Sequence, residues 1–548
     1  MALFVDFFGY LSVVFRGCTL AAQALAVGGV AFLIFVARPR ATRLGEAGYT
    51  VLRRCRFGIA LASVGLAAFA LLSLGSDLAA LIEILGFERA DPLHADFVRA
   101  GMAQAAAGLV LACVVLLRPN APAALLVIPA LAMLGASAAT SHAAARLQHQ
   151  WALGAVTFVH EAAACTWIGA LPYLLATLAL PIEGKELHPL GRRFHGLATV
   201  SVGTLLAGAA ALSYSYVGGL GGLYGTAYGV MVGVKGVMAA SMLALGFFNS
   251  RRVARLRDDP DGPLLALRRF TEVEVGIGIT IFLATASLIS VPPAVDLREG
   301  RLTLAELGAR MTPTWPRLTS PEHSELALQV LQAKLDAAAG GRAEPAYVPG
   351  AGAPPPYLAE DVAWSEYNHH WAGVFVLAIG VLALIERIFR ARWARSWPLL
   401  FAGLALFLLI RSDPEAWPMG SISFWASFRE PEVAQHRVFM ALITVFAFFE
   451  WGVRTGRTRS PRAALVLPLL CALGGAILLT HSHALGNVKE ELLIEYTHAP
   501  LALLGVAAGW SRWLEVRLPG TAAARRASWI WPISFALVGV LLILYREA

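Results

Sequence analysis

Histidine is the residue type in this sequence with the clearest capacity for chemistry. Neutral imidazole is the commonest protein ligand for copper, zinc, iron and nickel at physiological pH. The chain has 13 histidines, and most lie near the ends of long apolar runs. Side chains from several helix ends can converge on one ion, so the pattern predicts metal binding. The candidate ligands are His94, His142, His160, His370, His436, His481, His483 and His498. We interpret His149 and His369 as bystanders.

A second group of residues follows one face of a predicted helix. Met231, Lys235, Met238 and Met242 are separated by offsets close to whole helical turns, which places them on one stripe. Thioethers are soft ligands suited to Cu(I), so the stripe could relay a metal ion. Methionine also fills gaps between packed helices, and the sequence leaves both interpretations open.

Glu161 and Lys235 are ionisable residues inside predicted spans. Glu161 follows His160, and Lys235 lies about seven residues into its span. Charged groups at such depth are costly unless they are paired or functional. Glu161 and Lys235 could therefore form an ion pair, or each could reach the membrane interface. We include Glu161, Lys235 and the three methionines in a candidate translocation path.

The elements that must position these residues are membrane helices. Of 548 residues, 57% are hydrophobic and 15% are charged, and apolar runs of about twenty residues, enough to cross a hydrocarbon core of roughly 30 Å, recur along the chain. The fold class predicted is an all-α polytopic membrane protein with about fourteen transmembrane helices. The predicted spans are 18–37, 57–75, 97–117, 121–139, 154–177, 195–215, 228–248, 273–291, 371–389, 397–411, 438–453, 463–480, 497–514 and 528–545.

The distribution of arginine predicts how these helices are oriented. Basic loops alternate with arginine-poor ones, which the positive-inside rule explains better than nucleic-acid binding despite the formal charge of +8. The basic loops are Arg38 to Arg56, Lys185 to Arg193, Arg251 to Arg269, Arg387 to Arg395, Arg454 to Arg462 and Arg512 to Arg526. We therefore expect a bacterial inner-membrane protein with both termini and most histidines on the periplasmic side. His195, on the cytoplasmic side, is the weakest candidate for a path inward.

The sequence also contains an internal similarity. Pro129 to His142 aligns without gaps with Pro468 to His481, and neighbouring histidines recur at matching spacings. This predicts a parallel duplication of a five-helix unit, at roughly 15–180 and 368–515. We divide the chain into a membrane domain at 1–291, a Pro- and Gly-rich periplasmic connector or lid at 292–366 with one helical stretch near Glu322 to Ala339, and a C-terminal membrane domain at 367–548.

Three segments read together resemble a known family. They are HEAAACTWIGALPYLL at 160–175, RRFHGLATVSVGTLLAGA at 192–209 and YGVMVGVKGVMAASMLALGFFNSRR at 228–252. They are similar to the copper-resistance D (CopD/PcoD) family over roughly 150–291. The shared pattern falls on His160, Trp167, Gly169, Arg192, Arg193, Tyr228, Gly229 and Lys235. The resemblance implies an inner-membrane protein of copper handling that moves copper or receives it from a periplasmic carrier. The second half would belong to longer relatives.

Three functions follow from these observations. The first is copper capture by periplasmic-side histidines, with transport or delivery of Cu(I) or Cu(II). The second is electron transfer by b-type haem, held by His142 with His160 or by His436 with His498. The third is a copper docking or assembly factor without transport. The sequence contains no nucleophile elbow, HExxH motif or phosphate-binding glycine loop, so we expect no enzyme. The predicted partners are the bilayer and a periplasmic copper carrier.

Overall fold

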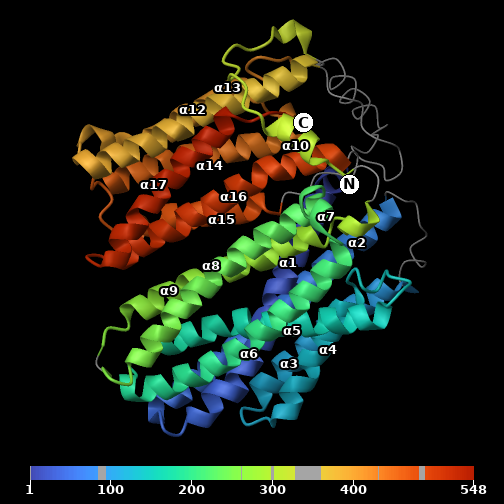
Figure 1. The fold of residues 1–548 in the computed structure, drawn as a ribbon, viewed down its shortest axis with the longest axis vertical. Coiled ribbons are helices and arrows are strands. Elements are labelled where there is room, and N and C mark those ends of the chain that lie inside the picture. Colours follow the sequence, from blue (N-terminus) through green and yellow to red (C-terminus); the bar gives the residue numbers. More distant parts are fainter. Residues whose placement is uncertain are drawn as a thin grey trace. The chain divides into compact units, whose positions relative to one another are not determined.

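A computed structural model gives the structure of the chain, and it describes residues 2–83, 94–260, 262–297, 301–326, 359–429, 431–480 and 488–547. Within these ranges the chain is helical, with one isolated β-bridge between Ala416 and Ile422. Figure 1 shows long helices that pack along one another within each part of the chain. The all-α fold class is therefore confirmed, and the chain is a polytopic membrane protein.

Each of the fourteen predicted spans falls on one helix. They are α1 (Ala2–Phe32), α2 (Gly45–Glu83), α3 (Asp96–Leu117), α4 (Ala123–Ala139), α5 (Gln150–Leu178), α6 (Gly184–Tyr216), α8 (Ala227–Arg255), α9 (Leu265–Leu288), α12 (Ala359–Phe389), α13 (Leu399–Arg411), α14 (Pro431–Arg454), α15 (Val466–Leu478), α16 (Val488–Arg517) and α17 (Ala522–Ile543). Eleven helical segments are long and apolar enough to cross a membrane, and the apolar helices at α4 and α15 are shorter. Two short helices, α7 (Leu220–Tyr224) and α10 (Leu304–Met311), complete the described set.

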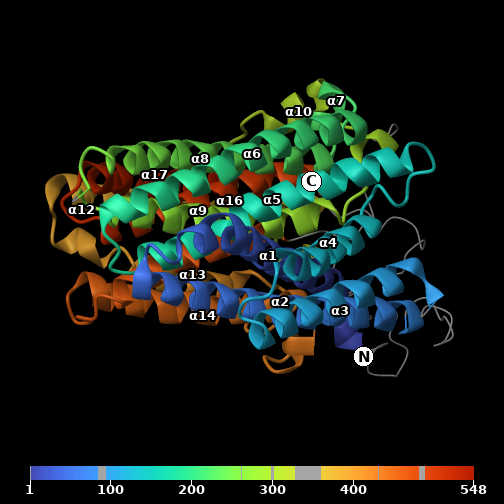
Figure 2. The ribbon, with the colours of Figure 1, turned by 90° about the horizontal axis from the view of Figure 1, so that it is seen from below.

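The chain forms two compact units. The first unit comprises Tyr10–Arg301 with Thr480–Ser482, and the second comprises Leu302–Leu479 and His483–Ala548 with Met1–Gly9. In the first unit α2 lies beside α3, as Figure 2 shows, and α8 lies beside α9. Helix α5 packs against α4, α6 and α9. The three-part domain division at residues 291 and 366 remains a prediction.

Two glycines let α1 and α5 approach closely in the first unit. A Cβ atom at Gly169 would lie 1.8 Å from the backbone oxygen of Ala24, and one at Gly28 would lie 2.3 Å from the Gly169 carbonyl carbon. Any larger residue would therefore force the backbones apart. The close crossing brings Gln23 of α1 against the face of α5 that carries Glu161 and Cys165.

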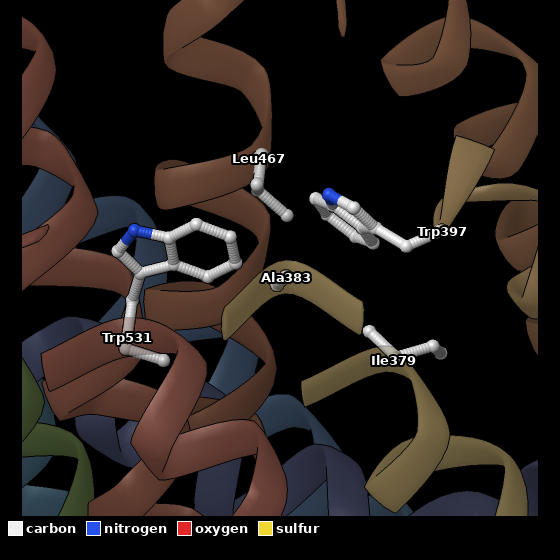
Figure 3. Packing of buried hydrophobic residues seen from close by; sticks show 6 residues of the cluster. Ile379, Ala383, Trp397, Leu467 and Trp531 are labelled. Atoms are coloured by element: carbon white, nitrogen blue, oxygen red, sulfur yellow. The ribbon is translucent and has the colours of Figure 1, made fainter. Parts of the chain in front are cut away.

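The core of the second unit lies where α12, α15, α16 and α17 meet. Trp397 and Trp531 pack with their ring centroids 5.6 Å apart, and Ile379, Ala383 and Leu467 fill the space around them (Figure 3). Both indole nitrogens donate to carboxylates: Trp397 Nε1 to Glu386 at 3.1 Å, and Trp531 Nε1 to Glu515 at 2.7 Å. Buried indoles need such partners, so polar residues fix the ends of this core.

Several arginines of the predicted basic loops are paired in the second unit. Arg454 contacts Glu450 at 2.8 Å and Glu386 at 3.6 Å, and Arg512 contacts Glu515 at 2.6 Å. The Arg454–Glu386 pair joins α14 to α12, and Arg387 of α12 reaches Glu515 of α16 at 3.9 Å. Part of the positive charge in the sequence therefore holds helices together.

The described part of the segment at 292–366 is divided between the units, because residues up to Arg301 belong to the first unit and those from Leu302 belong to the second. Helix α10 begins with a capping box formed by Thr303 and Glu306, a signal that we did not use. The predicted helical stretch near Glu322 to Ala339 begins with a short 3-10 turn at His323–Glu325, and its remainder from residue 327 lies outside the described residues. The His323 ring donates from Nε2 to the Pro414 carbonyl at 2.6 Å.

The proposed duplication would pair α1–α5 with α12–α16. The order of helices agrees, but the packing differs in detail. Helix α3 packs extensively on both α2 and α4, whereas α14 packs mainly on α13 and α15 mainly on α16. The duplication therefore stays a prediction from the sequence.

Candidate functional site

His160 lies on α5 with one ring nitrogen fixed by the neighbouring helix. Its Nδ1 lies 3.1 Å from the Leu205 carbonyl oxygen of α6. Because a carbonyl only accepts, Nδ1 must carry the hydrogen. A Cβ atom at Gly208 would lie only 3.0 Å from the His160 Cβ, so this glycine makes room for the ring. The lone pair of His160 is therefore on Nε2, which is the arrangement that metal-binding histidines commonly adopt.

Glu161 turns away from α6 into a cluster of polar side chains. The Ser137 side chain from α4 and the Gln23 side chain from α1 face its carboxylate. Gln23 Oε1 in turn accepts a hydrogen bond of 2.7 Å from Gln104 of α3. Among the described residues, the Oε2 atom of Glu161 has no hydrogen-bond partner within normal geometry. Residues from four helices thus surround one carboxylate inside the predicted spans.

Lys235 of α8 faces the same region. Its charge acts on both His160 and Glu161, but the described residues include no direct ion pair between Lys235 and Glu161 within 4.0 Å. The direct pair that the sequence allowed is therefore not formed. The reason is geometric, because Glu161 points towards α1 and α4 whereas Lys235 approaches from α8.

His142 occupies the end of the unit where α6 ends and α8 begins. Its ring makes edge contacts with Tyr216 and Tyr228, each at 6.1 Å between centroids. Arg146 covers the Tyr216 ring at 5.4 Å and forms a bidentate pair with Asp296 at 2.7 and 2.9 Å. Within the described part of the chain, the buried Nε2 of His142 has no hydrogen-bond partner.

The surroundings of His142 favour its neutral form. Burial lowers the pKa of His142 below the usual histidine range, and the positive charges of Arg146 and Arg16 lower it further. A backbone hydrogen bond at Leu288 and the charge of Asp296 oppose this shift only in part. Neutral imidazole is the form that binds metal ions, so the surroundings of His142 favour the form of the ring that a metal ligand needs.

The three methionines of the predicted stripe are all buried. Their exposed fractions are 1% for Met231, 2% for Met238 and 0% for Met242. A Cβ atom at Gly278 of α9 would lie 3.5 Å from the Met242 terminal methyl, so Met242 faces α9. This burial agrees with the expected single face, and it is compatible with both packing and a relay.

Histidines of the second unit are engaged in other contacts. His370 accepts a hydrogen bond of 2.7 Å from the Arg317 amide at Nδ1 and donates from Nε2 to the Tyr545 carbonyl at 2.8 Å. Both of its ring nitrogens are thus used by the backbone. His436 Nδ1 lies 2.7 Å from the Asp413 carboxylate. These contacts hold loops and the C-terminal segment in place.

His369 and His498 flank one aromatic ring in the second unit. His369 stacks on Tyr545 with a centroid distance of 3.9 Å, and His498 meets the same ring edge-on at 6.5 Å. Tyr545 donates its hydroxyl hydrogen to Glu547 at 3.2 Å. We interpreted His369 from the sequence as a bystander, but it lies in the same cluster as the candidate His498.

The remaining candidates are not assembled into a site. His94 is exposed before α3, and His481 and His483 lie outside the described residues. Across the ranges that the structure describes, no group of three or more His, Cys, Asp and Glu side chains is arranged to hold a metal ion. The metal-ligand set therefore remains a prediction, and the residues that the structure brings near one another are His160, Glu161 and Lys235.

Sequence reasoning missed several members of this cluster. Gln23, Gln104 and Ser137 lie in predicted spans and face Glu161 directly or through each other. Their signal was available, because buried polar side chains in a membrane helix need partners.

Comparison with known proteins supports one part of the resemblance. Residues 189–288 match the family model for Copper resistance protein D, CopD. The matched segment contains Tyr228, Gly229 and Lys235, whereas His160 and Trp167 precede it. No curated protein and no solved structure matches the chain. The chain is therefore a multi-pass membrane protein whose residues 189–288 form a domain of the Copper resistance protein D family.

Proposed function

We propose that this protein captures copper at the periplasmic face of a bacterial inner membrane and moves it inward along α8. The observation that carries the proposal is the buried row of Met231, Met238 and Met242 within the CopD domain. Three thioethers on one helix face form a series of soft donors for Cu(I). The orientation follows from the arginine-rich loops.

Two neutral imidazoles provide the entry to this row. His142 lies level with Tyr228 at the start of α8, and His160 lies level with Lys235. The seven residues from Tyr228 to Lys235 correspond to about 10 Å along a helix. An ion bound first near His142 would therefore reach His160 about two turns deeper.

The methionines continue the same direction. Met242 lies fourteen residues after Tyr228, or about 21 Å along the helix axis. This distance is a large part of a hydrocarbon core of roughly 30 Å. Weak thioether sites at successive turns would let copper enter and leave each site, as conduction through several sites requires.

Lys235 has a definite role in this proposal. Its ammonium group near His160 opposes the accumulation of a second cation, and the carboxylate of Glu161 on the other side of α5 balances that charge. Lys235 and Glu161 do not touch, but their opposite charges keep the net charge around His160 close to zero. Charge balance of this kind limits the cost of an ion inside the membrane.

The proposed capture step is tested by replacing both imidazoles. We expect His142→Gln with His160→Gln to weaken copper binding to the purified protein by about tenfold or more, because ligand and orienting groups in metal sites contribute on that scale. His149→Asn is the matched control, since His149 is exposed with a positive φ of 56° that Asn tolerates.

Isothermal titration and elemental analysis of the detergent-purified protein measure this effect. Unchanged copper affinity and content in the double variant would place the capture site elsewhere. Iron with a strong Soret band in the wild-type protein would instead contradict the copper proposal and identify a haem protein.

A further inference from the structure

The buried face of α8 continues past the methionines to a polar pair. Asn249 of α8 and Glu274 of α9 are exposed by only 7% and 4%. Asn249 donates from Nδ2 to the Glu274 Oε1 atom at 3.2 Å, and it lies 3.4 Å from the Thr271 hydroxyl. Its own Oδ1 atom is buried and has no hydrogen-bond partner among the described residues. An unpaired buried oxygen beside a carboxylate is a costly arrangement.

The packing of α8 against α9 places this pair directly after the last methionine. The Met242 methyl lies beside Gly278, and a Cβ atom at Gly246 would lie 3.6 Å from the Glu274 Oε1 atom. Asn249 then meets Glu274 one turn further along. Met242 and the Glu274 carboxylate therefore lie in the same interface between the two helices.

The charge of Glu274 is not balanced by a cationic side chain. Within the described ranges, Glu274 forms no ion pair, because Arg269 and Glu272 of the same helix pair with each other. Arg252 of α8 instead stacks over Phe270 at 4.3 Å. Beside Val275 and Ile279 of α9, helices α1 and α5 present only apolar side chains among the residues that line the space between them. These are Ala21, Ala24, Leu25, Ile168 and Pro172.

A carboxyl group in such surroundings requires a bound cation or a proton to be neutral. The neighbouring oxygen of Asn249 and the thioether of Met242 are both suited to accept a metal ion weakly. Oxygen donors hold Cu(I) less tightly than thiolates or thioethers, so a mixed set favours release over retention. Weak binding at the inner end of the path would let copper leave the protein.

We propose that Glu274, Asn249 and Met242 form an inner copper-binding station at the end of the methionine row. This inference rests on the proposed transport along α8. Copper arriving from Met242 is held by the Glu274 carboxylate and the Asn249 Oδ1 atom. The ion is then released towards the arginine-rich end of α8.

Copper uptake by proteoliposomes tests the station. We compare wild type, Glu274→Gln and Glu274→Asp, with Glu272→Gln as the control because it removes a carboxylate on the same helix that is paired with Arg269. We expect Glu274→Gln to slow uptake by about tenfold or more, Glu274→Asp to recover part of the rate, and Glu272→Gln to match wild type. Copper binding near His142, measured in detergent, should be unchanged in all variants.

The outcomes separate this inference from the proposed function. If wild type takes up copper and Glu274→Gln takes it up at the same rate, the station is overturned and the proposed transport is still supported. No uptake by wild type would overturn transport and the station together. If Glu274→Gln does not give folded protein, uptake is measured with Asn249→Leu instead. This variant removes the unpaired Asn249 oxygen and keeps the Glu274 carboxyl group. An unchanged uptake rate in folded Asn249→Leu would likewise overturn the station.

Discussion

His142 and His160, the two imidazoles of the proposed copper entry, differ in the interactions that favour a metal-binding form. The Leu205 carbonyl fixes the tautomer of His160, whereas burial and two arginines keep His142 neutral. The first effect depends on the geometry of one hydrogen bond. The lowered pKa of His142 depends partly on the charges of Arg146 and Arg16, so it can be changed without replacing the histidine.

The pH dependence of copper capture should therefore respond to Arg146. A lowered pKa means that His142 remains neutral to a lower pH than an unperturbed histidine, so protons compete less with copper. Arg146→Gln removes a charge that lowers this pKa and leaves the Asp296 charge, which raises it. We expect the loss of copper affinity in the variant to begin at a higher pH than in wild type.

Copper affinity measured between pH 5 and 8, the range in which histidines titrate, checks this prediction. Arg99→Gln is the control, because Arg99 forms an exposed ion pair with Asp96 at the start of α3. Identical pH profiles for Arg146→Gln and wild type would show that His142 is not the titrating ligand.

Residue types and spacing could predict part of the site. His142, His160, Lys235 and the methionines were found because imidazole, ammonium and thioether groups are distinctive in an apolar sequence. The engagement of His370 by the Arg317 amide and the Tyr545 carbonyl could not be predicted. It depends on how distant segments fold against α12, which helical spacing does not specify.

At the scale of elements, the contact between α1 and α5 decides whether the polar cluster forms. Gly169→Ala would put a methyl group where the Ala24 backbone oxygen lies 1.8 Å away. We expect a loss of about 1 to 3 kcal/mol in stability from such overpacking, together with a lower temperature of unfolding. Gly154→Ala on the same helix is the control, because a Cβ atom there meets nothing within 4 Å.

Thermal unfolding of the detergent-purified variants, followed by tryptophan fluorescence, measures the difference. Equal unfolding temperatures for Gly169→Ala and Gly154→Ala would contradict the close packing of the two backbones.

Helix positions were predictable because apolar runs of span length are a strong signal. The shortest prediction, 397–411, corresponds to α13 (Leu399–Arg411), which a 3-10 turn at Trp393–Ser396 extends at its start. Helix α10 was missed because it is short and polar, although its capping box was visible in the sequence. Pairing between helices was not predictable, since it depends on contacts such as Gly169 with Ala24.

At the scale of the whole molecule, the direction of transport depends on orientation. The arginine-rich loops predict that Leu147 faces the periplasm and Asp258 faces the cytoplasm, and both residues are exposed. In intact cells, we expect a membrane-impermeant maleimide to label Leu147→Cys above the background of the native cysteines. Asp258→Cys should be labelled only after the membrane is opened. The reverse pattern would invert the proposed direction.

Copper uptake by sealed proteoliposomes of the Met238→Leu and Met242→Leu double variant tests the central claim most directly. Leucine keeps the volume and burial of these side chains and removes their thioethers, so packing should change little. Transport along α8 predicts uptake slowed by about tenfold or more, with copper binding at His142 and His160 in detergent equal to wild type. Uptake at the wild-type rate would contradict the account, because copper would then cross without the methionine row.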